Sequence, residues 1–361
     1  MPLTILLFIA SLSVLILAHE WGHFIAARRA GMKIEEFGIG FPPRVWGRKR
    51  GGVLYSVNLL PIGGFVRILG EDGGHRGEAG SFSSKPIVSR MLVIAAGVLM
   101  NVAVAWLLIS AIFMIGAPTE LTSDELASSA RDRSVFISFV AEGSPAQAAG
   151  IKAGDKVIAI STPNARIEPI GASEVQQFVG TFAGKEISII VERGNERANY
   201  TITPRDNVPQ GQGPLGVALA EVGTVSYPPH EAVWRAGISA FSRLNAIASE
   251  LWNVVSTLVR TGSASESIAG PVGVASMAGV VQQQGVVNYL FFLAIISLNL
   301  AVINAIPFPA LDGGRFLFLI IEQLKGSPVN KRYEAAVHAA GFAVLMLLVA
   351  LITIRDIRNL M

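Results

Sequence analysis

The stretch that decides the fold is residues 3–27, LTILLFIASLSVLILAHEWGHFIAA, which is mostly apolar and contains two histidines and a glutamate near its end. A helix needs about 20 consecutive apolar residues to cross a bilayer, and this stretch has them. Residues 91–115, 286–306 and 335–354 form three further stretches of the same kind. The sequence therefore predicts a multi-pass α-helical membrane protein with four transmembrane helices.

The composition agrees with a membrane protein. Of the 361 residues, 51% are hydrophobic and 15% are charged, and the mean hydropathy is +0.51. Soluble domains carry about 25% charged residues, so this chain falls outside that class. The chain has no cysteine, which excludes disulfides, thiolate zinc sites, iron–sulfur clusters and cysteine nucleophiles.

The basic residues predict the orientation, because cytoplasmic loops are enriched in Lys and Arg. No basic residue precedes the first stretch and two follow it, so it is expected to be a retained span and not a signal peptide. The N-terminus is then outside, and four spans place the C-terminus and residues 116–285 outside as well. The loop between the first two stretches contains Arg28, Arg29, Lys33, Arg44, Arg48, Lys49, Arg50, Arg67, Arg76, Lys85 and Arg90.

The segment predicted to lie outside has two parts. Residues 131–205 have the pattern of a small α+β domain, with a helix beginning at Ser173, where Gln176 would complete a capping box, and a turn at Gly194-Asn195. Residues 215–285 contain a long helical pattern that is apolar on one face and too polar to span. We expect this amphipathic region to lie on the membrane surface or to pack on the small domain.

The strongest chemical signal is His19-Glu20-Trp21-Gly22-His23. Residues i and i+4 share one face of a helix, so the two imidazoles converge and Glu20 can reach a ligand bound between them. This is the H-E-x-x-H spacing of zinc hydrolases. Ionisable residues within a span are costly and usually functional. The alternative is that residues 19–23 are only the polar margin of the span.

A catalytic zinc site needs a third protein ligand and leaves a fourth position for water. Asp312 is the best candidate, because it ends the run Asn304-Ala-Ile-Pro-Phe-Pro-Ala-Leu-Asp312-Gly-Gly. Pro307 and Pro309 must break the third span, and irregular backbone at membrane depth survives only inside protein or beside a wet cavity. Both segments run inward, so Asp312 arrives at the same leaflet as His19. A helix N-cap is the alternative role of Asp312.

Together these motifs resemble the site-2 proteases, and most closely their bacterial regulator of sigma-E protease branch. The small domain adds Ser144-Pro145-Ala146-x-x-Ala149-Gly150-Ile151-x-x-Gly154-Asp155, a run typical of PDZ domains. The resemblance implies an intramembrane zinc metalloprotease in which His19, His23 and Asp312 bind Zn²⁺ and Glu20 is the catalytic residue. It implies a PDZ groove between a strand at residues 135–140 and the helix from Ser173.

The resemblance also implies partners and a location. The substrates would be single-span membrane proteins, such as an anti-sigma factor or signal-peptide remnants, some of them first trimmed by an extracytoplasmic protease. The location would be the bilayer of the bacterial inner membrane, with the PDZ domain outside and the active site near the cytoplasmic leaflet. No nucleic-acid partner is expected. Four residues would handle the substrate, namely Asn299, Asn304, Pro307 and Pro309.

Two departures separate the chain from its expected relatives, which carry two PDZ domains where this chain has room for one, and a histidine where it has Arg315. The motif Gly270-Pro271-Val272-Gly273 also matches the family. The alternatives to a protease are a metal transporter that uses the same ligands and a PDZ-based membrane adaptor. The expected organisation is transmembrane helix 1 in residues 1–30, a cytoplasmic loop with a re-entrant β-loop in 31–90, transmembrane helix 2 in 91–115, the PDZ domain in 131–205, the amphipathic region in 215–285, transmembrane helix 3 in 286–325 and transmembrane helix 4 in 335–354.

Overall fold

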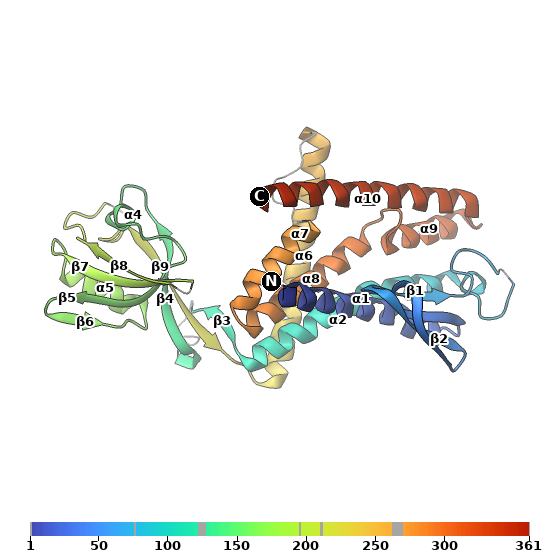
Figure 1. Cartoon of the computed structure of the whole chain (residues 1–361), viewed down its shortest axis with the longest axis horizontal. Coiled ribbons are helices and arrows are strands. Elements are labelled where there is room, and N and C mark those ends of the chain that lie inside the picture. The colour runs from blue at the N-terminus through green and yellow to red at the C-terminus, as the bar shows by residue number, and fades with distance from the viewer. Residues whose placement is uncertain are drawn as a thin grey trace. The chain divides into compact units, whose positions relative to one another are not determined.

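A computed structural model describes residues 2–75, 77–121, 128–194, 196–209, 212–261 and 270–360. Arg76 of the basic loop and Asn195 of the expected turn lie outside the described residues. The chain forms two compact units (Figure 1). The helical unit comprises Met1–Ile112 and His230–Met361, and the sheet unit comprises Phe113–Pro229.

Within the described part of the chain, four helices are long and apolar enough to cross a membrane. The third ends at Ala305, just before the proline-containing segment, and a separate helix, α9 (Asp312–Lys325), begins with the expected ligand. The structure thus confirms a multi-pass membrane protein with four candidate spans and an inserted β-rich region. The four helices are α1 (Pro2–Arg29), α2 (Ile87–Ile115), α8 (Val286–Ala305) and α10 (Lys331–Leu360).

Helices α1 and α2 approach closely because α1 has a glycine at the contact. A Cβ atom at Gly22 would lie 2.9 Å from the backbone carbon of Ala96 and 2.9 Å from the Cβ of Met100, which is too close for any side chain. A second tie joins α2 to α9, where Arg90 and Glu322 form a two-bond ion pair with distances of 2.8 and 3.0 Å. The contact at Gly22 holds the helical turn after His19 against α2, and the ion pair holds α2 against α9.

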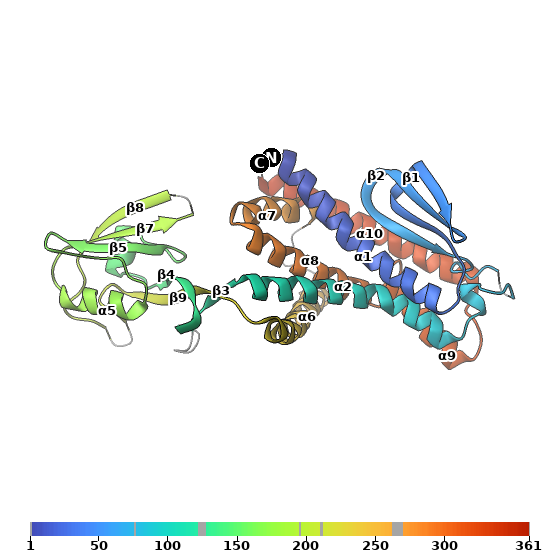
Figure 2. The same ribbon diagram turned by 90° about the horizontal axis from the view of Figure 1, so that it is seen from below.

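The loop between α1 and α2 folds into a long hairpin of β1 (Ile34–Arg50) and β2 (Val53–Ile68). Both strands bend, and register shifts let residues 36–39 pair with residues 54–57 on one side and with residues 64–67 on the other. Aromatic contacts anchor the hairpin to α1, because the Phe24 ring lies 5.5 Å from that of Phe37 and 6.3 Å from that of Tyr55. Figure 2 shows the hairpin beside the end of α1.

The described residues of the sheet unit form a seven-stranded sheet, with the short helices α4 (Pro145–Ala149) and α5 (Ala172–Thr181) packed on it. The strand order is β3-β9-β4-β5-β7-β8, with β6 paired to β5. Fully buried Val135, Ile160 and Val191 mark the core that packs beneath α5. The strands are β3 (Ala117–Glu120), β4 (Arg131–Val140), β5 (Lys156–Thr162), β6 (Ala165–Ile167), β7 (Ile187–Arg193), β8 (Glu196–Ile202) and β9 (Val217–Val225).

Strand β9 changes two local expectations. The strand at residues 135–140 lies between β9 and β5, and β9 is the strand that bonds to the start of the neighbouring helix. The groove expected between residues 135–140 and the helix from Ser173 is therefore not the arrangement found. The helix also begins one residue earlier, at Ala172, with Gly171 as N-cap and no side-chain cap. Glu221 of β9 replaces the expected capping box, because its Oε1 accepts the Ala172 amide proton at 2.6 Å.

The motif at residues 270–273 begins α7 (Pro271–Gln283), which follows α6 (Pro229–Thr261). The carboxylate of Asp356, in the last turns of α10, accepts the Gly273 amide proton at 2.7 Å and caps α7 from another helix. A Cβ atom at Gly270 would lie 2.7 Å from the same carboxylate oxygen. The motif therefore joins α7 to α10. On α6 the expected apolar face is exposed, as at Trp234, Phe241 and Trp252.

The ion pair between α2 and α9 generates a stability prediction. The side chains of Arg90 and Glu322 are only 9% and 16% exposed, so Arg90→Gln leaves a largely buried carboxylate unpaired. We expect this change to lower the free energy of unfolding of the purified protein in detergent micelles by about 3 kcal/mol. The matched control is Glu78→Gln, which breaks the exposed pair with His75 and should cost under about 0.5 kcal/mol. Equal denaturation midpoints for the two variants would contradict this role of Arg90.

Candidate metal centre

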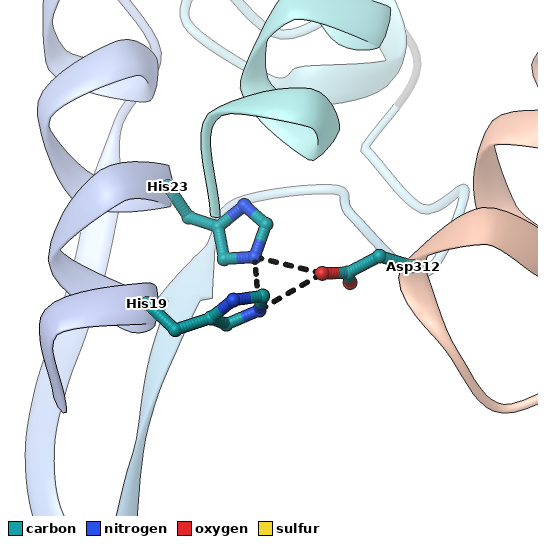
Figure 3. A group of neighbouring side chains, drawn as sticks. All are labelled: His19, His23 and Asp312. Atoms are coloured by element: carbon teal, nitrogen blue, oxygen red, sulfur yellow. Dashed lines mark hydrogen bonds and ion pairs between the residues drawn. The ribbon is translucent and has the colours of Figure 1, made fainter. Parts of the chain in front are cut away.

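The three ligands expected from the sequence lie together in the structure (Figure 3). Nε2 of His19 lies 2.9 Å from Oδ2 of Asp312, and Nε2 of His23 lies 3.2 Å from the same oxygen. The two Nε2 atoms are 3.1 Å apart. Among the described residues these three side chains form the one group of histidines and carboxylates that could hold a metal ion, with all ligand atoms within 4.8 Å of one another.

Asp312 reaches this position because the chain between α8 and α9 is irregular. Pro307 and Pro309 lie in that segment, and the two glycines that follow the ligand are buried against its backbone. A Cβ atom at Gly314 would lie 2.8 Å from the carbonyl carbon of Phe308, so the start of α9 packs directly on the loop. Asp312 is the first residue of α9 and not its N-cap, which is Leu311.

His338 of α10 holds the same loop from the other side. Its Nδ1 accepts the amide proton of Ala310 at 2.9 Å. Ala310 has a φ angle of +79°, a conformation that non-glycine residues rarely adopt. The contact therefore holds a strained residue two positions before Asp312 in place. Its only signal in the sequence is a single histidine in the fourth span.

Helix α2 orients both imidazoles. Nδ1 of His23 donates to the backbone carbonyl of Val93 at 2.8 Å, which leaves the Nε2 lone pair free for a metal. Nδ1 of His19 lies 3.2 Å from the side-chain amide of Asn101, which is fully buried. With the amide nitrogen facing His19, the Oδ1 atom of Asn101 is buried and has no partner among the described residues.

If the side-chain amide of Asn101 is turned the other way, its Oδ1 atom gains a partner. Oδ1 of Asn101 then accepts the Nδ1 proton of His19, and the Nε2 lone pair of His19 also points toward Asp312. Two neutral imidazoles with free Nε2 atoms and one carboxylate form the donor set of a catalytic zinc site. The residues present therefore fit Zn²⁺.

Gly97 of α2 provides the space for this arrangement. A Cβ atom there would lie 2.6 Å from Cε1 of His23 and 2.8 Å from Cε1 of His19, so both rings occupy the place of a missing side chain. Gly97 and Asn101 are four residues apart and face α1 together. The lone asparagine of the second span was the available sequence signal for this support, whereas Gly97 had none.

Glu20 lies beside the ligands on α1 and contacts the hairpin. The backbone amide of Val66, in β2, donates to Oε2 of Glu20 at 3.0 Å. The hairpin edge at residues 64–68 thus lies next to the expected catalytic residue. Sequence reasoning placed the hairpin in this loop but did not find this contact.

The residues expected to bind substrate lie outside the group of expected zinc ligands. Asn299 donates its amide to the carbonyl of Ile295 in its own helix at 2.9 Å, and Asn304 lies in the last turn of α8. Among the described residues, neither amide forms a hydrogen bond with His19, His23 or Asp312. Arg315 forms an ion pair with Glu71.

Comparison with known proteins identifies a family that this chain matches. The model of peptidase family M50 matches residues 7–348. A protein of Clostridium perfringens named as a candidate zinc metalloprotease is 32% identical over 348 residues, covering 96% of each chain. The regulator of sigma-W protease RasP of Bacillus subtilis is 28% identical over 441 residues, covering 99% of each chain. The regulator of sigma-E protease RseP of Salmonella typhimurium is 28% identical over 449 residues, covering 98% of each chain.

The contact between Asn101 and His19 predicts a metal phenotype. Asn101→Leu removes the acceptor that orients the imidazole, and loss of such a support lowers metal affinity by about 10- to 100-fold. Zinc titration of the purified protein against a competing chelator measures this change. The matched control is Ser110→Ala, also in α2, because among the described residues the buried hydroxyl of Ser110 bonds only to the carbonyl of Trp106 in its own helix. Unchanged zinc affinity in Asn101→Leu would show that His19 needs no such support.

Proposed function

We propose roles for individual residues of this chain from one premise, which is that the chain belongs to peptidase family M50. The protein is an intramembrane zinc metalloprotease of the type that RasP and RseP represent. Family membership thereby favours the protease over the metal transporter and the membrane adaptor. His19, His23 and Asp312 hold the zinc ion, and Glu20 is the general base. The observation that carries this proposal is the convergence of the three ligand atoms beside Glu20.

The chemistry of the site follows from these positions. Bound zinc would polarise the scissile carbonyl and lower the pKa of a bound water to about 7. The carboxylate of Glu20 accepts the proton of the attacking water and returns it to the leaving amine nitrogen. The Val66 amide keeps Oε2 of Glu20 in place during this transfer. Asn299 and Asn304 position the substrate backbone above the site.

The hairpin presents the substrate as an extended strand. Residues 64–67 of β2 pair with β1 on one side, and the other side of this segment faces Glu20 through Val66. A substrate helix that unwinds beside this edge gains backbone hydrogen bonds as an added strand. Ile39, Phe41 and Leu60 of the hairpin are 44%, 47% and 52% exposed, which suits a re-entrant element in contact with lipid or substrate.

The basic residues around the hairpin support an active site near the cytoplasmic leaflet, with both termini and the sheet unit outside. A bacterial inner membrane is the location that agrees with the organisms of the relatives. The substrates are single-span membrane proteins. Anti-sigma factors are the first class to test, since two relatives are named as regulators of sigma factors, and a prior-acting extracytoplasmic protease would supply the trimmed form.

The sheet unit is a single PDZ domain in this proposal. Its Ser144-Pro145-Ala146 run begins α4, where the Ser144 hydroxyl caps the helix, and Gly150 ends it with a φ angle of +90°. Among the described residues, β3 pairs with residues 222–225 and the Leu121 amide donates to the Glu221 carbonyl at 2.8 Å. The edge of β9 at residues 217–220, next to α5, therefore replaces β4 as the strand of a peptide groove. The alignments to RasP and RseP are longer than this chain, so those relatives contain segments that it lacks.

Two substitutions separate the base from a ligand. Glu20→Gln should keep zinc and lower turnover of a single-span substrate by about 10²- to 10⁴-fold, because the ligands stay and only the proton acceptor is lost. Asp312→Ala should instead weaken zinc binding by more than about 100-fold, since a charged ligand is lost. Metal content and cleavage are measured on the same purified samples. Wild-type cleavage by Glu20→Gln, or full zinc occupancy in Asp312→Ala, would overturn the assigned roles.

Removal of the sheet unit tests its role as a filter. Ala117 and Val225 are paired across β3 and β9, so Gly116 and Ser226 can be joined by a two-residue turn after deletion of residues 117–225. We expect the shortened enzyme to cleave a minimal single-span peptide as before and an untrimmed precursor faster than the full chain does. Loss of minimal-peptide cleavage by a folded, zinc-loaded protein would make the unit a recruiting or structural element.

A further inference from the structure

A large basic pocket lies between the end of α1 and the tip of the hairpin, apart from the metal centre. Its volume is about 960 Å³, and its lining contains four cations and no carboxylate. All four cationic side chains are exposed, and none of them forms an ion pair with another described residue. The lining consists of Arg28, Trp46, Arg48, Lys49, Arg50, Gly51 and Tyr55.

The hairpin register builds this pocket. Trp46, Arg48 and Arg50 alternate along β1, so their side chains share one face of the strand. Arg48 lies opposite Tyr55 in β2, and the Tyr55 ring lies 6.3 Å from that of Phe24 in α1. Arg48 and Arg50 therefore share the face whose Tyr55 contacts α1, the helix that carries Arg28, and Lys49 completes the lining near the hairpin tip.

Glu36, the acidic residue nearest in sequence to the cations of the hairpin tip, is engaged elsewhere. The carboxylate of Glu36 is buried, 3.0 Å from Arg44 and 3.5 Å from Arg67. The charge of the pocket is thus uncompensated within its lining, and its chemistry selects an anion with several acceptor oxygens, such as a phosphate ester.

The position of the pocket identifies the source of that phosphate. The candidate span of α1 is Leu6–Arg29, so Arg28 lies at its end, where lipid headgroups begin. Trp46 is 55% exposed beside the cations, and tryptophan is enriched at this level of a membrane. A soluble phosphate ester would use the cations but would gain nothing from an apolar ring at the bilayer boundary.

We propose that this pocket is a binding site for the headgroup of an anionic phospholipid, held by Arg28, Arg48, Lys49 and Arg50 with Trp46 against its upper acyl chain. A bound lipid would connect the end of α1 to the hairpin tip. Each Lys or Arg near an anionic membrane surface contributes about fivefold in affinity, so the loss of three cations should weaken binding on the order of a hundredfold.

The test uses the full-length protein in detergent with equal amounts of phosphatidylglycerol and phosphatidylcholine, and native mass spectrometry counts the lipids that stay bound. The triple variant Arg48→Gln, Lys49→Gln, Arg50→Gln should lose the preference for phosphatidylglycerol. The matched control, Lys325→Gln, Lys331→Gln, Arg332→Gln, removes three exposed cations from α9 and α10 and should keep it. A third arm adds sn-glycerol 3-phosphate, which should not displace the lipid at millimolar concentration.

Three outcomes would overturn the proposal. Retained preference in the hairpin variant would place the lipid elsewhere. Equal loss in both variants would reduce the effect to the general attraction of a positive surface. Displacement by sn-glycerol 3-phosphate would identify a site for a soluble phosphate ester. Quenching of Trp46 by brominated phosphatidylglycerol, measured as the difference from Trp46→Phe, should exceed quenching by the brominated zwitterionic lipid, and equal quenching would remove Trp46 from the site.

Discussion

The structure depends on the desolvation cost of two imidazoles and two carboxylates placed close together inside a helical membrane protein. Each of these groups needs a partner, because an unpaired polar group in an apolar surrounding costs several kcal/mol. Nδ1 of His23 is satisfied by a backbone carbonyl and Nδ1 of His19 by Asn101, both from α2. The remaining Nε2 atoms and Asp312 face one another, so a metal ion would complete the set.

This requirement explains why α1 and α2 pack so closely. Gly22 lets the backbone of α2 approach α1, and Gly97 leaves room for both rings. A larger residue at either position would separate the helices and remove the partners of both Nδ1 atoms. The ion pair between Arg90 and Glu322 then joins α2 to the helix that carries Asp312. Metal binding and helix packing are thus two consequences of one arrangement.

Helix α10 contacts the rest of the helical unit mainly at two points. Among its described residues only Gly341 and Asp356 are buried. Gly341 packs against Pro309 of the ligand loop, with His338 one turn away, and Asp356 caps α7 near the other end. Most of the remaining helix is exposed, as expected of a surface that faces lipid. Its two attachments therefore link the ligand loop to the start of α7.

The sequence by itself determined the candidate spans, the expected ligand set and the family resemblance. These signals are local, since a span needs only length and apolarity, and H-E-x-x-H needs only helical spacing. Asp312 could be predicted from the sequence for the same reason, because two prolines and two glycines around one carboxylate indicate a broken helix at membrane depth. The comparisons confirm the zinc metalloprotease that these residues predict.

Only the tertiary structure decided which residues support the ligands and which strand borders α5. Asn101, Gly97, Val66 and His338 act through contacts with residues that are distant in sequence, so no periodicity or spacing reveals them. The expected capping box failed because Glu221, from a strand 49 positions away, supplies a carboxylate to the Ala172 amide. Strand order has the same origin. Each strand's pattern predicts that it is extended but not which neighbour takes its edge, because pairing is decided by the packing of the whole sheet.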